Sequence, residues 1–419
     1  MGKYIIKGGN KLNGEVFISG AKNAVLPILA STVLNSGICI LKNVPMLLDT
    51  FVAIDILKDL GCEVNYGENT VVVNSKNMYK TNVKEDLVKK MRSSIIFLGA
   101  IISRFKEASI SYPGGCNLGK RPIDFHLSAF KELGIKIEDN QKLIKASVDT
   151  IKERIIDLPF ASVGATQNII LASIFVKGKV VIKNCAKEPE IIDMVKFLRK
   201  MGANIYGEGT YTITVKGVEK LNNIVEYTIM PDRIEAGTFL CMSAITNGNV
   251  KINGITPNYV KSLTDILEQM GCNIVIDKDN IKIKNDKKLK CIEFLETKPY
   301  PYFPTDLQPQ LMALLATADG ESIIKENIFE ARNKHIPELN KMGCNIIEDN
   351  STFIIKGVNK LTGKNVFAKD LRGGASLITA GLFAKEKTVV EGADYINRGY
   401  EHLDKKLNIL GADIKHIKD

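Results

Sequence analysis

Six glycines recur at nearly constant spacing, and they restrict the possible folds more than any other feature of the sequence. They stand at positions 61, 134, 202, 271, 343 and 411, so the intervals between them are 73, 68, 69, 72 and 68 residues. Each glycine follows a Leu or a Met and precedes a short apolar segment, as at a helix that ends in a left-handed glycine before a strand. A repeat of this length predicts six copies of one supersecondary unit.

A second element keeps the same period. An apolar segment with almost no polar face opens each unit, which predicts a buried helix rather than a surface helix. A short strand is expected after each of these helices. The predicted buried helices are residues 22–32, 92–103, 164–175, 233–245, 305–316 and 373–383, and the predicted strands are residues 38–41, 108–111, 180–183, 250–253, 322–325 and 388–391.

The order of helix, strand, amphipathic helix and two further strands places the chain in the α/β class. Six units of this kind form either one ring or two domains of three units, and the usual size of a domain favours two. Residues 5–12 resemble residues 354–361, which end the fifth unit. We therefore interpret residues 1–20 as the strand end of a unit that begins elsewhere, and the repeat alone does not show which domain they complete.

Composition excludes several classes of protein. The net charge of +10 arises from lysines and acids that alternate along the chain, without the basic block of a nucleic-acid-binding tail. The eight cysteines form no Cys-x-x-Cys pair and the four histidines are scattered, so we expect free thiols in a reducing compartment, no metal and no cofactor. No signal peptide is expected, and Pro27 interrupts the longest uncharged run, residues 24–41. We expect a cytoplasmic protein without a membrane, nucleic-acid or obligate protein partner.

The glycine-rich loop at residues 113–122 is a candidate for chemistry. It contains Cys116, and two cations follow within five residues. Nearby positive charge stabilises a thiolate, whereas an ordinary surface turn would carry an incidental cysteine; the loop alone favours neither interpretation. Three other cysteines directly follow the repeat glycines and are expected to be structural: Cys62, Cys272 and Cys344.

Polar residues stand where the buried helices begin. Lys22 and Asn23 open the first helix, where free amides and an ammonium group favour an anion, although a solvated lysine is the common alternative. Arginines lie at similar positions or in loops, and we expect several of them to converge on one anionic ligand. They are Arg92, Arg121, Arg233, Arg332, Arg372 and Arg398.

The fifth buried helix begins with Thr305-Asp306-Leu307-Gln308, which has the Thr-x-x-Gln pattern of a capping box. The helix dipole would keep Asp306 ionised, as a general base requires, or the acid would only complement the dipole. Asp232 and Glu235, at the start of the fourth helix, are expected to form structural ion pairs.

In combination and in order, these motifs resemble the UDP-N-acetylglucosamine enolpyruvyl (1-carboxyvinyl) transferase family. The resemblance implies two inside-out α/β domains, each with three β-α-β-α-β-β repeats around buried helices and with the active site between them. The implied domains are residues 21–229 and residues 1–20 plus 230–419. The motifs are Gly20-Ala21-Lys22-Asn23-Ala24, Pro113-Gly114-Gly115-Cys116 with Arg121-Pro122, Ser162-Val163-Gly164-Ala165, Pro231-Asp232-Arg233-Ile234-Glu235, Pro304-Thr305-Asp306, Arg332 with His335 and Pro337-Glu338-Leu339, Leu371-Arg372-Gly373-Gly374, and Arg398-Gly399-Tyr400-Glu401.

The resemblance also implies a reaction. The enolpyruvyl group of phosphoenolpyruvate moves to the 3-hydroxyl of UDP-N-acetylglucosamine and phosphate is released, as the first committed step of peptidoglycan synthesis. Cys116 would protonate the enol carbon and be the target of fosfomycin, and Asp306 would accept the hydroxyl proton. The implied phosphoenolpyruvate ligands are Lys22, Asn23, Arg121, Arg332, Arg372 and Arg398. The implied sugar-nucleotide ligands are Arg92, Arg121, Pro122, Ile123, Asp124, Phe125, Ser162, Val163, Gly164, Asp306 and Ile328.

One departure and three alternatives accompany this interpretation. Family members often have a lysine before the Ser-Val-Gly-Ala stretch, where this chain has Phe160 and Ala161, so one nucleotide contact is not expected here. The sister enzyme that acts on shikimate 3-phosphate lacks the cysteine loop. An RNA-binding repeat protein would interleave its basic residues with exposed aromatics. An inactive scaffold would not need Cys116, Asp306 and Lys22 together.

Overall fold

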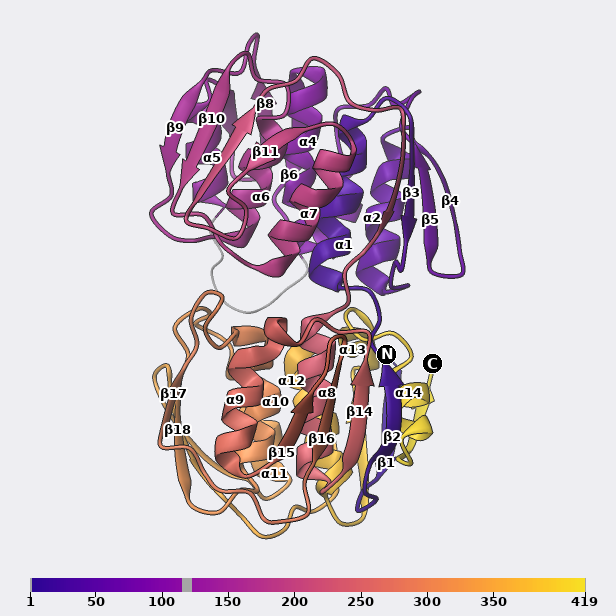
Figure 1. The fold of residues 1–419 in the computed structure, drawn as a ribbon, viewed down its shortest axis with the longest axis vertical. Coiled ribbons are helices and arrows are strands. Elements are labelled where there is room, and N and C mark those ends of the chain that lie inside the picture. The colour runs from indigo at the N-terminus through magenta and orange to yellow at the C-terminus, as the bar shows by residue number, and fades with distance from the viewer. Residues whose placement is uncertain (1, 115–122, 419) are drawn as a thin grey trace. The chain divides into compact units, whose positions relative to one another are not determined.

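The computed structural model describes residues 2–114 and 123–418, and its contacts divide the chain into two compact units (Figure 1). The first unit comprises residues 20–114 and 123–230, and the second unit comprises residues 2–19 and 231–418. The strands form six small sheets, five of four strands and one of three among the described residues. The predicted α/β class is confirmed.

The first unit contains three sheets. Their strands, in the order of pairing, are β13 (Ile224–Thr228), β3 (Ile38–Lys42), β5 (Thr70–Asn74) and β4 (Glu63–Gly67); β6 (Glu107–Ser111), β8 (Leu143–Ser147) and β7 (Lys136–Asp139); and β11 (Asn204–Tyr206), β12 (Thr212–Lys216), β10 (Lys179–Lys183) and β9 (Arg154–Asp157). Its helices are α1 (Lys22–Ser31), α2 (Leu48–Asp59), α3 (Glu85–Lys90), α4 (Ile96–Phe105), α5 (Asp124–Glu132), α6 (Val163–Ala172) and α7 (Pro189–Lys200), with 3-10 turns η1 (Thr32–Leu34) and η2 (Arg92–Ile95).

The second unit repeats this plan. Its sheets are β15 (Asn273–Ile276), β16 (Asn280–Lys284), β14 (Asn249–Asn253) and β2 (Asn13–Phe17); β17 (Phe294–Glu296), β18 (Glu321–Lys325), β20 (Thr352–Lys356) and β19 (Asn345–Asp349); and β21 (Asn365–Phe367), β22 (Lys387–Glu391), β1 (Lys3–Lys7) and β23 (Asp413–Ile417). Its helices are α8 (Arg233–Ile245), α9 (Lys261–Met270), α10 (Gln308–Leu315), α11 (Ile336–Lys341), α12 (Leu371–Phe383), α13 (Ala393–Asn397) and α14 (Leu403–Ile409), with 3-10 turns η3 (Pro257–Val260) and η4 (Thr305–Leu307).

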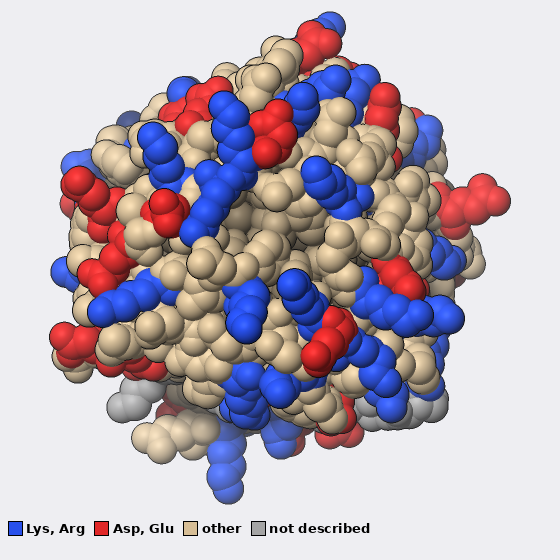
Figure 2. All heavy atoms as spheres, turned by 90° about the horizontal axis from the view of Figure 1, so that it is seen from below, with Lys and Arg blue, Asp and Glu red and all other residues tan. Residues whose placement is uncertain are grey.

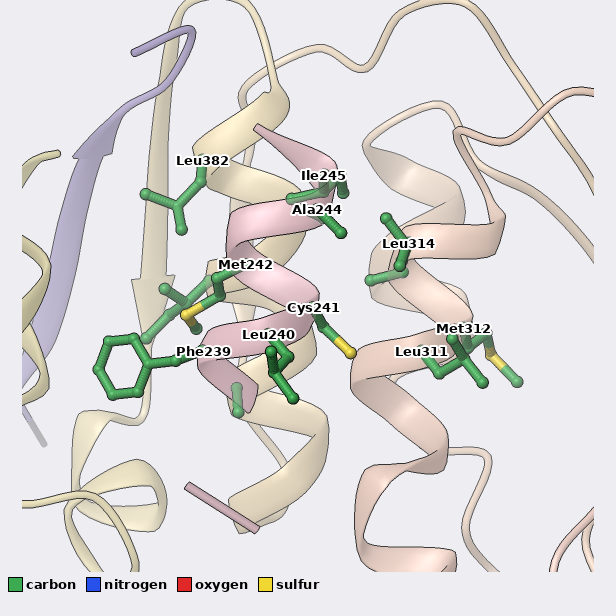
Figure 3. Close-up of a cluster of buried hydrophobic side chains, with 14 of the residues drawn as sticks. Phe239, Leu240, Cys241, Met242, Ala244, Ile245, Leu311, Met312, Leu314 and Leu382 are labelled. Atoms are coloured by element: carbon green, nitrogen blue, oxygen red, sulfur yellow. The ribbon is translucent and has the colours of Figure 1, made fainter. Parts of the chain in front are cut away.

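Helices, not sheets, occupy the centre of each unit. In the first unit α4 packs against both α1 and α6, and in the second unit α8, α10 and α12 contact one another. Every residue of α8 and of α10 is buried, which confirms the predicted buried helices, whereas strands such as β10 and β22 alternate buried and more exposed residues. Cys241 of α8 and Leu314 of α10 point toward each other's helix, and Leu382 of α12 belongs to the same buried cluster (Figure 3). Burial of these apolar surfaces is the main stabilising contribution to such a core.

The six repeat glycines have the backbone conformation that their spacing predicts. Their φ angles are 98°, 83°, 101°, 108°, 99° and 93° at positions 61, 134, 202, 271, 343 and 411. A residue with a Cβ rarely adopts this left-handed conformation, which explains why glycine recurs at the end of each outer helix.

The starts of two central helices differ from the sequence prediction. The second begins as the 3-10 turn η2 before it continues as α4, and the fifth begins as the 3-10 turn η4. The capping box predicted at Thr305 is wrong, because Thr305 makes no capping hydrogen bond and its Oγ1 instead accepts a hydrogen bond from Arg332 Nε at 3.3 Å. A nearby guanidinium thus takes the acceptor that an isolated helix would use for its cap.

In both units, strands that are distant in sequence complete a sheet. β1 pairs antiparallel with β22 and β23, and β2 pairs parallel with β14, so residues 3–17 complete two sheets of the second unit. β13, which directly precedes the second unit in sequence, pairs parallel with β3 of the first unit. Among the described residues, the chain therefore passes from one unit to the other twice, after residue 19 and after residue 230.

The surface carries mixed charge. On the face drawn in Figure 2, lysines and arginines are interspersed with aspartates and glutamates and do not gather in one basic patch. Among the described residues, no helix is long and apolar enough to cross a membrane.

Candidate active site

Asp306 lies at the start of the fifth central helix, between two arginines. Arg332 Nη2 is 2.8 Å from Asp306 Oδ1, and Arg372 Nη2 and Nε are 3.1 and 3.3 Å from Oδ2. The arginine side chains are only 2 % and 3 % exposed, whereas 24 % of the Asp306 side chain is exposed. The two buried guanidinium groups thus hold a carboxylate that remains accessible.

Local structure holds each guanidinium in place. Arg372 lies in the first turn of α12, where the side chain of Asp370 accepts hydrogen bonds from the backbone amides of Arg372 and Gly373. The guanidinium of Arg332 lies over the ring of Phe329, and its Nη1 is 3.9 Å from Oδ1 of Asp370. Burial alone would lower the pKa of Arg372, but the negative charge of Asp306 raises that pKa above its ordinary value.

A buried hydroxyl network lies behind Arg372. The guanidinium is 5.5 Å from the ring centre of Tyr400, whose hydroxyl is 2.8 Å from Thr238 Oγ1 and 3.0 Å from Gln310 Nε2. These residues come from α8, α10 and the segment after α13, so the three-helix core of the second unit supports the arginine directly.

The other predicted second-unit residues occupy defined places. Arg398 follows α13 directly and is half-buried. Ile328 lies in the loop after β18, where Oε1 of the buried Glu326 accepts hydrogen bonds from the amides of Ile328 and Phe329. Arg233 opens α8 and lies over the ring of Tyr300. Glu235 forms the predicted ion pair, with Lys406 at 2.7 Å.

In the first unit, Lys22 opens α1 and Asn23 follows it. Lys22 Nζ is 2.8 Å from Asp49 Oδ2, and the two side chains are 12 % and 5 % exposed. The sequence reasoning missed Asp49. Its position in the first turn of the amphipathic helix α2 was the available signal, because an acid there complements the helix dipole.

The remaining first-unit residues lie at three element starts. Arg92 opens η2 and its Nη1 donates to the carbonyl of Pro113 at 3.3 Å. Ser162 caps α6, in which Val163 and Gly164 are the first two residues. Ile123 precedes α5, and Asp124 and Phe125 begin it. Phe160 is 42 % exposed. Cys116, Arg121 and Pro122 lie outside the described residues.

The cysteines after the repeat glycines lie in the protein interior. Burial raises the pKa of the Cys62, Cys272 and Cys344 thiols to about 12, so they remain protonated near neutral pH and have a structural role, as predicted. Within residues 2–114 and 123–418, no group of three or more His, Cys, Asp or Glu side chains is arranged to hold a metal ion.

Known proteins align with the whole chain. The family model for EPSP synthase (3-phosphoshikimate 1-carboxyvinyltransferase) matches residues 6–407. UDP-N-acetylglucosamine 1-carboxyvinyltransferase 2 of Caldanaerobacter subterraneus subsp. tengcongensis is 46 % identical over 417 residues, with 100 % of both chains covered. UDP-N-acetylglucosamine 1-carboxyvinyltransferase 1 of Clostridium acetobutylicum is 45 % identical over 420 residues, with the same coverage. The chain belongs to the UDP-N-acetylglucosamine 1-carboxyvinyltransferases.

Solved structures share the fold of this 1-carboxyvinyltransferase. The enolpyruvyl transferase NikO from Streptomyces tendae aligns with a TM-score of 0.90 at 25 % identity, covering 100 % of this chain and 99 % of NikO. EPSP synthase from Acinetobacter baumannii aligns with a TM-score of 0.76 at 19 % identity, with both chains fully covered. At that identity the second likeness concerns the fold alone.

Proposed function

We propose that this chain transfers the enolpyruvyl group of phosphoenolpyruvate to the 3-hydroxyl of UDP-N-acetylglucosamine, releases phosphate and thereby starts peptidoglycan synthesis. The 46 % and 45 % sequence identity to two UDP-N-acetylglucosamine 1-carboxyvinyltransferases, over the full length of each, supports this reaction. The observation that carries the chemistry is the accessible carboxylate of Asp306 between two buried guanidinium groups. Neighbouring positive charge keeps a carboxylate ionised, which a base needs.

The reaction proceeds by addition and elimination. Asp306 accepts the proton of the 3-hydroxyl as its oxygen bonds to C2 of phosphoenolpyruvate, and Cys116 donates a proton to C3. In the elimination, the Cys116 thiolate takes a proton from C3 of the tetrahedral adduct, the C2–O bond to phosphate breaks, and the leaving phosphate takes the proton held by Asp306. The double bond and the starting protonation states of both side chains are thereby restored, so two positioned acid–base groups suffice.

The charged residues divide between two substrates. Lys22, with Asn23 beside it, and Arg121, Arg332, Arg372 and Arg398 compensate the carboxylate and phosphate of phosphoenolpyruvate. Arg332 and Arg372 already bind a carboxylate, that of Asp306, which supports their affinity for such groups. The remaining residues bind the sugar nucleotide. They are Arg92, residues 121–125, Ser162, Val163 and Gly164 at the start of α6, and Ile328.

The finer architecture belongs to the same proposal. The two domains are residues 21–229 and residues 1–20 plus 230–419, each an inside-out arrangement of three β-α-β-α-β-β repeats, and the reaction draws on residues of both. The contact-defined units and the central position of α8, α10 and α12 support this division. The enzyme works in the cytoplasm on its two small-molecule substrates, with no cofactor and no nucleic-acid, membrane or obligate protein partner.

Replacing Cys116 tests whether its thiol is the acid that protonates C3 of phosphoenolpyruvate. Cys116→Ala should lower phosphate release at least a hundredfold, since general acid catalysis typically contributes about 10²–10⁴ in rate, and should abolish covalent labelling by fosfomycin. Cys291→Ala is the matched control, because Cys291 is the half-buried cysteine of the described chain and the others there are buried. Full turnover by Cys116→Ala, or fosfomycin labelling that persists in it, would contradict the proposed role.

A further inference from the structure

His126, in the first turn of α5, has a role that the proposed chemistry does not assign. It is only 7 % exposed, and its Nδ1 lies 3.0 Å from Nδ2 of Asn168 in α6. Which ring nitrogen carries the proton decides what the other nitrogen does, and the partner of Nδ1 determines that choice.

The surroundings fix the orientation of the Asn168 amide. Asn168 Oδ1 accepts a hydrogen bond from the backbone amide of Gly99 at 2.8 Å, and Nδ2 donates to the carbonyl of Ile95 at 2.9 Å. These are the two backbone groups that a regular α-helix pairs with each other, so the side chain bridges the junction of η2 and α4. Rotating the amide would place oxygen against a carbonyl and nitrogen against an amide hydrogen.

The amide orientation in turn fixes the imidazole. One Nδ2 hydrogen of Asn168 goes to Ile95, and the other points to His126 Nδ1, which must therefore accept it. The ring proton is consequently on Nε2. Gly99 makes this close fit possible, since a Cβ there would lie 2.2 Å from Asn168 Oδ1.

The protonated edge of the ring faces the start of α6. A Cβ added at Gly164 would lie 3.2 Å from Cε1 and 3.3 Å from Nε2 of His126. Within the described parts of the chain, the only hydrogen bond of the His126 ring is the one at Nδ1. The Nε2–H group is thus an unused donor beside the first amides of α6, where the helix dipole favours an anion.

The ring remains neutral near physiological pH. Burial, and secondarily the positive charge of Arg92, lowers the pKa of His126 to about 4. A neutral imidazole donates from Nε2 without titrating, so its hydrogen bond does not depend on the pH of the cell.

We infer that His126 donates a hydrogen bond from Nε2 to a phosphate oxygen of the bound sugar nucleotide, and that Asn168 is the positioning residue that fixes this tautomer. The inference rests on the proposed function, which places Ser162, Val163 and Gly164 at the sugar nucleotide. His126 would thus contribute an uncharged hydrogen-bond donor in a fixed orientation, in addition to the amides of α6 and the guanidinium of Arg92. A pyrophosphate is the part of that substrate that such donors recognise.

Two variants test the inference by calorimetric titration with UDP-N-acetylglucosamine in the absence of phosphoenolpyruvate. His126→Phe keeps the ring and removes both nitrogens, and Asn168→Asp presents an acceptor to Nδ1 and so moves the ring proton away from Nε2. Both should bind roughly 10- to 100-fold more weakly, the loss typical of a hydrogen bond to a charged group, with the KM for phosphoenolpyruvate unchanged. Asn285→Ala, which removes a buried amide of the second unit, should bind as wild type does.

A measurement on the unmodified protein covers the case in which the variants do not fold. Nitrogen NMR of the histidine side chains should show His126 with Nε2 protonated and Nδ1 unprotonated, and UDP-N-acetylglucosamine should shift the Nε2 resonance more than the Nδ1 resonance. A proton on Nδ1, or variant affinities within twofold of wild type, would overturn the inference while wild-type binding leaves the proposed function intact. Failure of the wild-type chain to bind the sugar nucleotide would instead overturn both.

Discussion

The two units share one plan but differ in the charged and polar groups at the starts of their central helices. In the second unit, Arg332 and Arg372 are almost fully buried and both bind Asp306. In the described part of the first unit, the buried groups near the central helices include the ion pair of Lys22 with Asp49 and the neutral pair of His126 and Asn168. The second unit therefore concentrates fixed charge around one carboxylate, whereas the described part of the first unit combines an ion pair with a neutral hydrogen-bonded pair.

The opposite ends of the central helices differ as well. In the first unit, Arg104 donates to the carbonyls of Val33, Asn35 and Ser75 and closes that end of the core. In the second unit, a cavity of about 150 Å³ lies at the ends of α8 and α12, and Asn285 donates to the carbonyl of Ala244 beside it. A guanidinium satisfies several helix-end carbonyls at once, while an amide satisfies few, so the first unit depends more on a single side chain.

The largest expected effect tests the charge of the second unit. Asp306→Asn keeps the shape and removes the base, so phosphate release should fall about 10²- to 10⁴-fold while calorimetry still detects the sugar nucleotide. Asp49→Asn is the matched change in the first unit, and its rate loss should be smaller because Asp49 acts on the substrates only indirectly, through its ion pair with Lys22. Phosphate release by Asp306→Asn at the wild-type rate would contradict the role of Asp306 as the base.

The next effect tests the closure of the helix ends. Arg104→Met removes three hydrogen bonds to carbonyls and should lower the free energy of unfolding by about 2–4 kcal/mol. Asn285→Ala in the second unit should lower it by about 1–2 kcal/mol. The chain has no tryptophan, so circular dichroism in a urea titration is the suitable measurement. An equal loss of unfolding free energy in the two variants would contradict the difference between the helix ends of the two units.

A pH titration compares one buried histidine from each unit. Burial, and also the charge of Arg92 for His126 and of Arg332 for His335, lowers the pKa of both to about 4, although Asp370 acts in the opposite sense on His335. The folded state therefore binds these protons more weakly than the unfolded chain, whose histidine pKa is about 6.5. The stability they contribute is present above about pH 6.5 and is lost as the pH falls towards 4.

Each histidine should account for about 2 kcal/mol of the stability lost between pH 7.5 and pH 5. His126→Phe and His335→Leu should each flatten the pH dependence of the urea midpoint by a similar amount. A variant whose midpoint falls as steeply as that of wild type would show that its histidine is protonated in the folded state, and that the corresponding unit tolerates the charge.

The smallest expected effect concerns one support of the second-unit cluster. Thr305→Val removes the 3.3 Å hydrogen bond from Arg332 Nε and leaves the three hydrogen bonds that Asp306 accepts from the two arginines. Turnover should change less than about threefold and the free energy of unfolding by about 0.5–1 kcal/mol, the usual contribution of a neutral acceptor. A tenfold loss of rate would show that Arg332 needs Thr305 for its orientation, and would make the cluster more cooperative than its distances suggest.

Much of the fold followed from local rules. The left-handed glycines and the apolar helices each depend on residues that are close together in the sequence. The six repeats and the buried helices such as α8 could therefore be predicted. The start of α10 was not, because the Thr305 hydroxyl binds Arg332, which is 27 residues away. Such competition between a local cap and a distant partner has no signature in a short motif.

The site was predictable in part, for the same reason. The charged motif residues could be named, and the structure brings Asp306, Arg332 and Arg372 together. Asp49 and the pair of His126 and Asn168 escaped notice, because each depends on contacts between helices far apart in sequence. Neutral buried polar residues are hard to distinguish from core residues until their hydrogen-bond partners are known.

The most direct test of the account measures phosphate release from phosphoenolpyruvate with two acceptors in parallel. We expect release with UDP-N-acetylglucosamine and none with shikimate 3-phosphate, and the product should carry the enolpyruvyl group on the 3-oxygen of the sugar. Release only with shikimate 3-phosphate would keep the fold and overturn the substrate assigned to the first unit. Release with neither acceptor would contradict the proposed reaction itself.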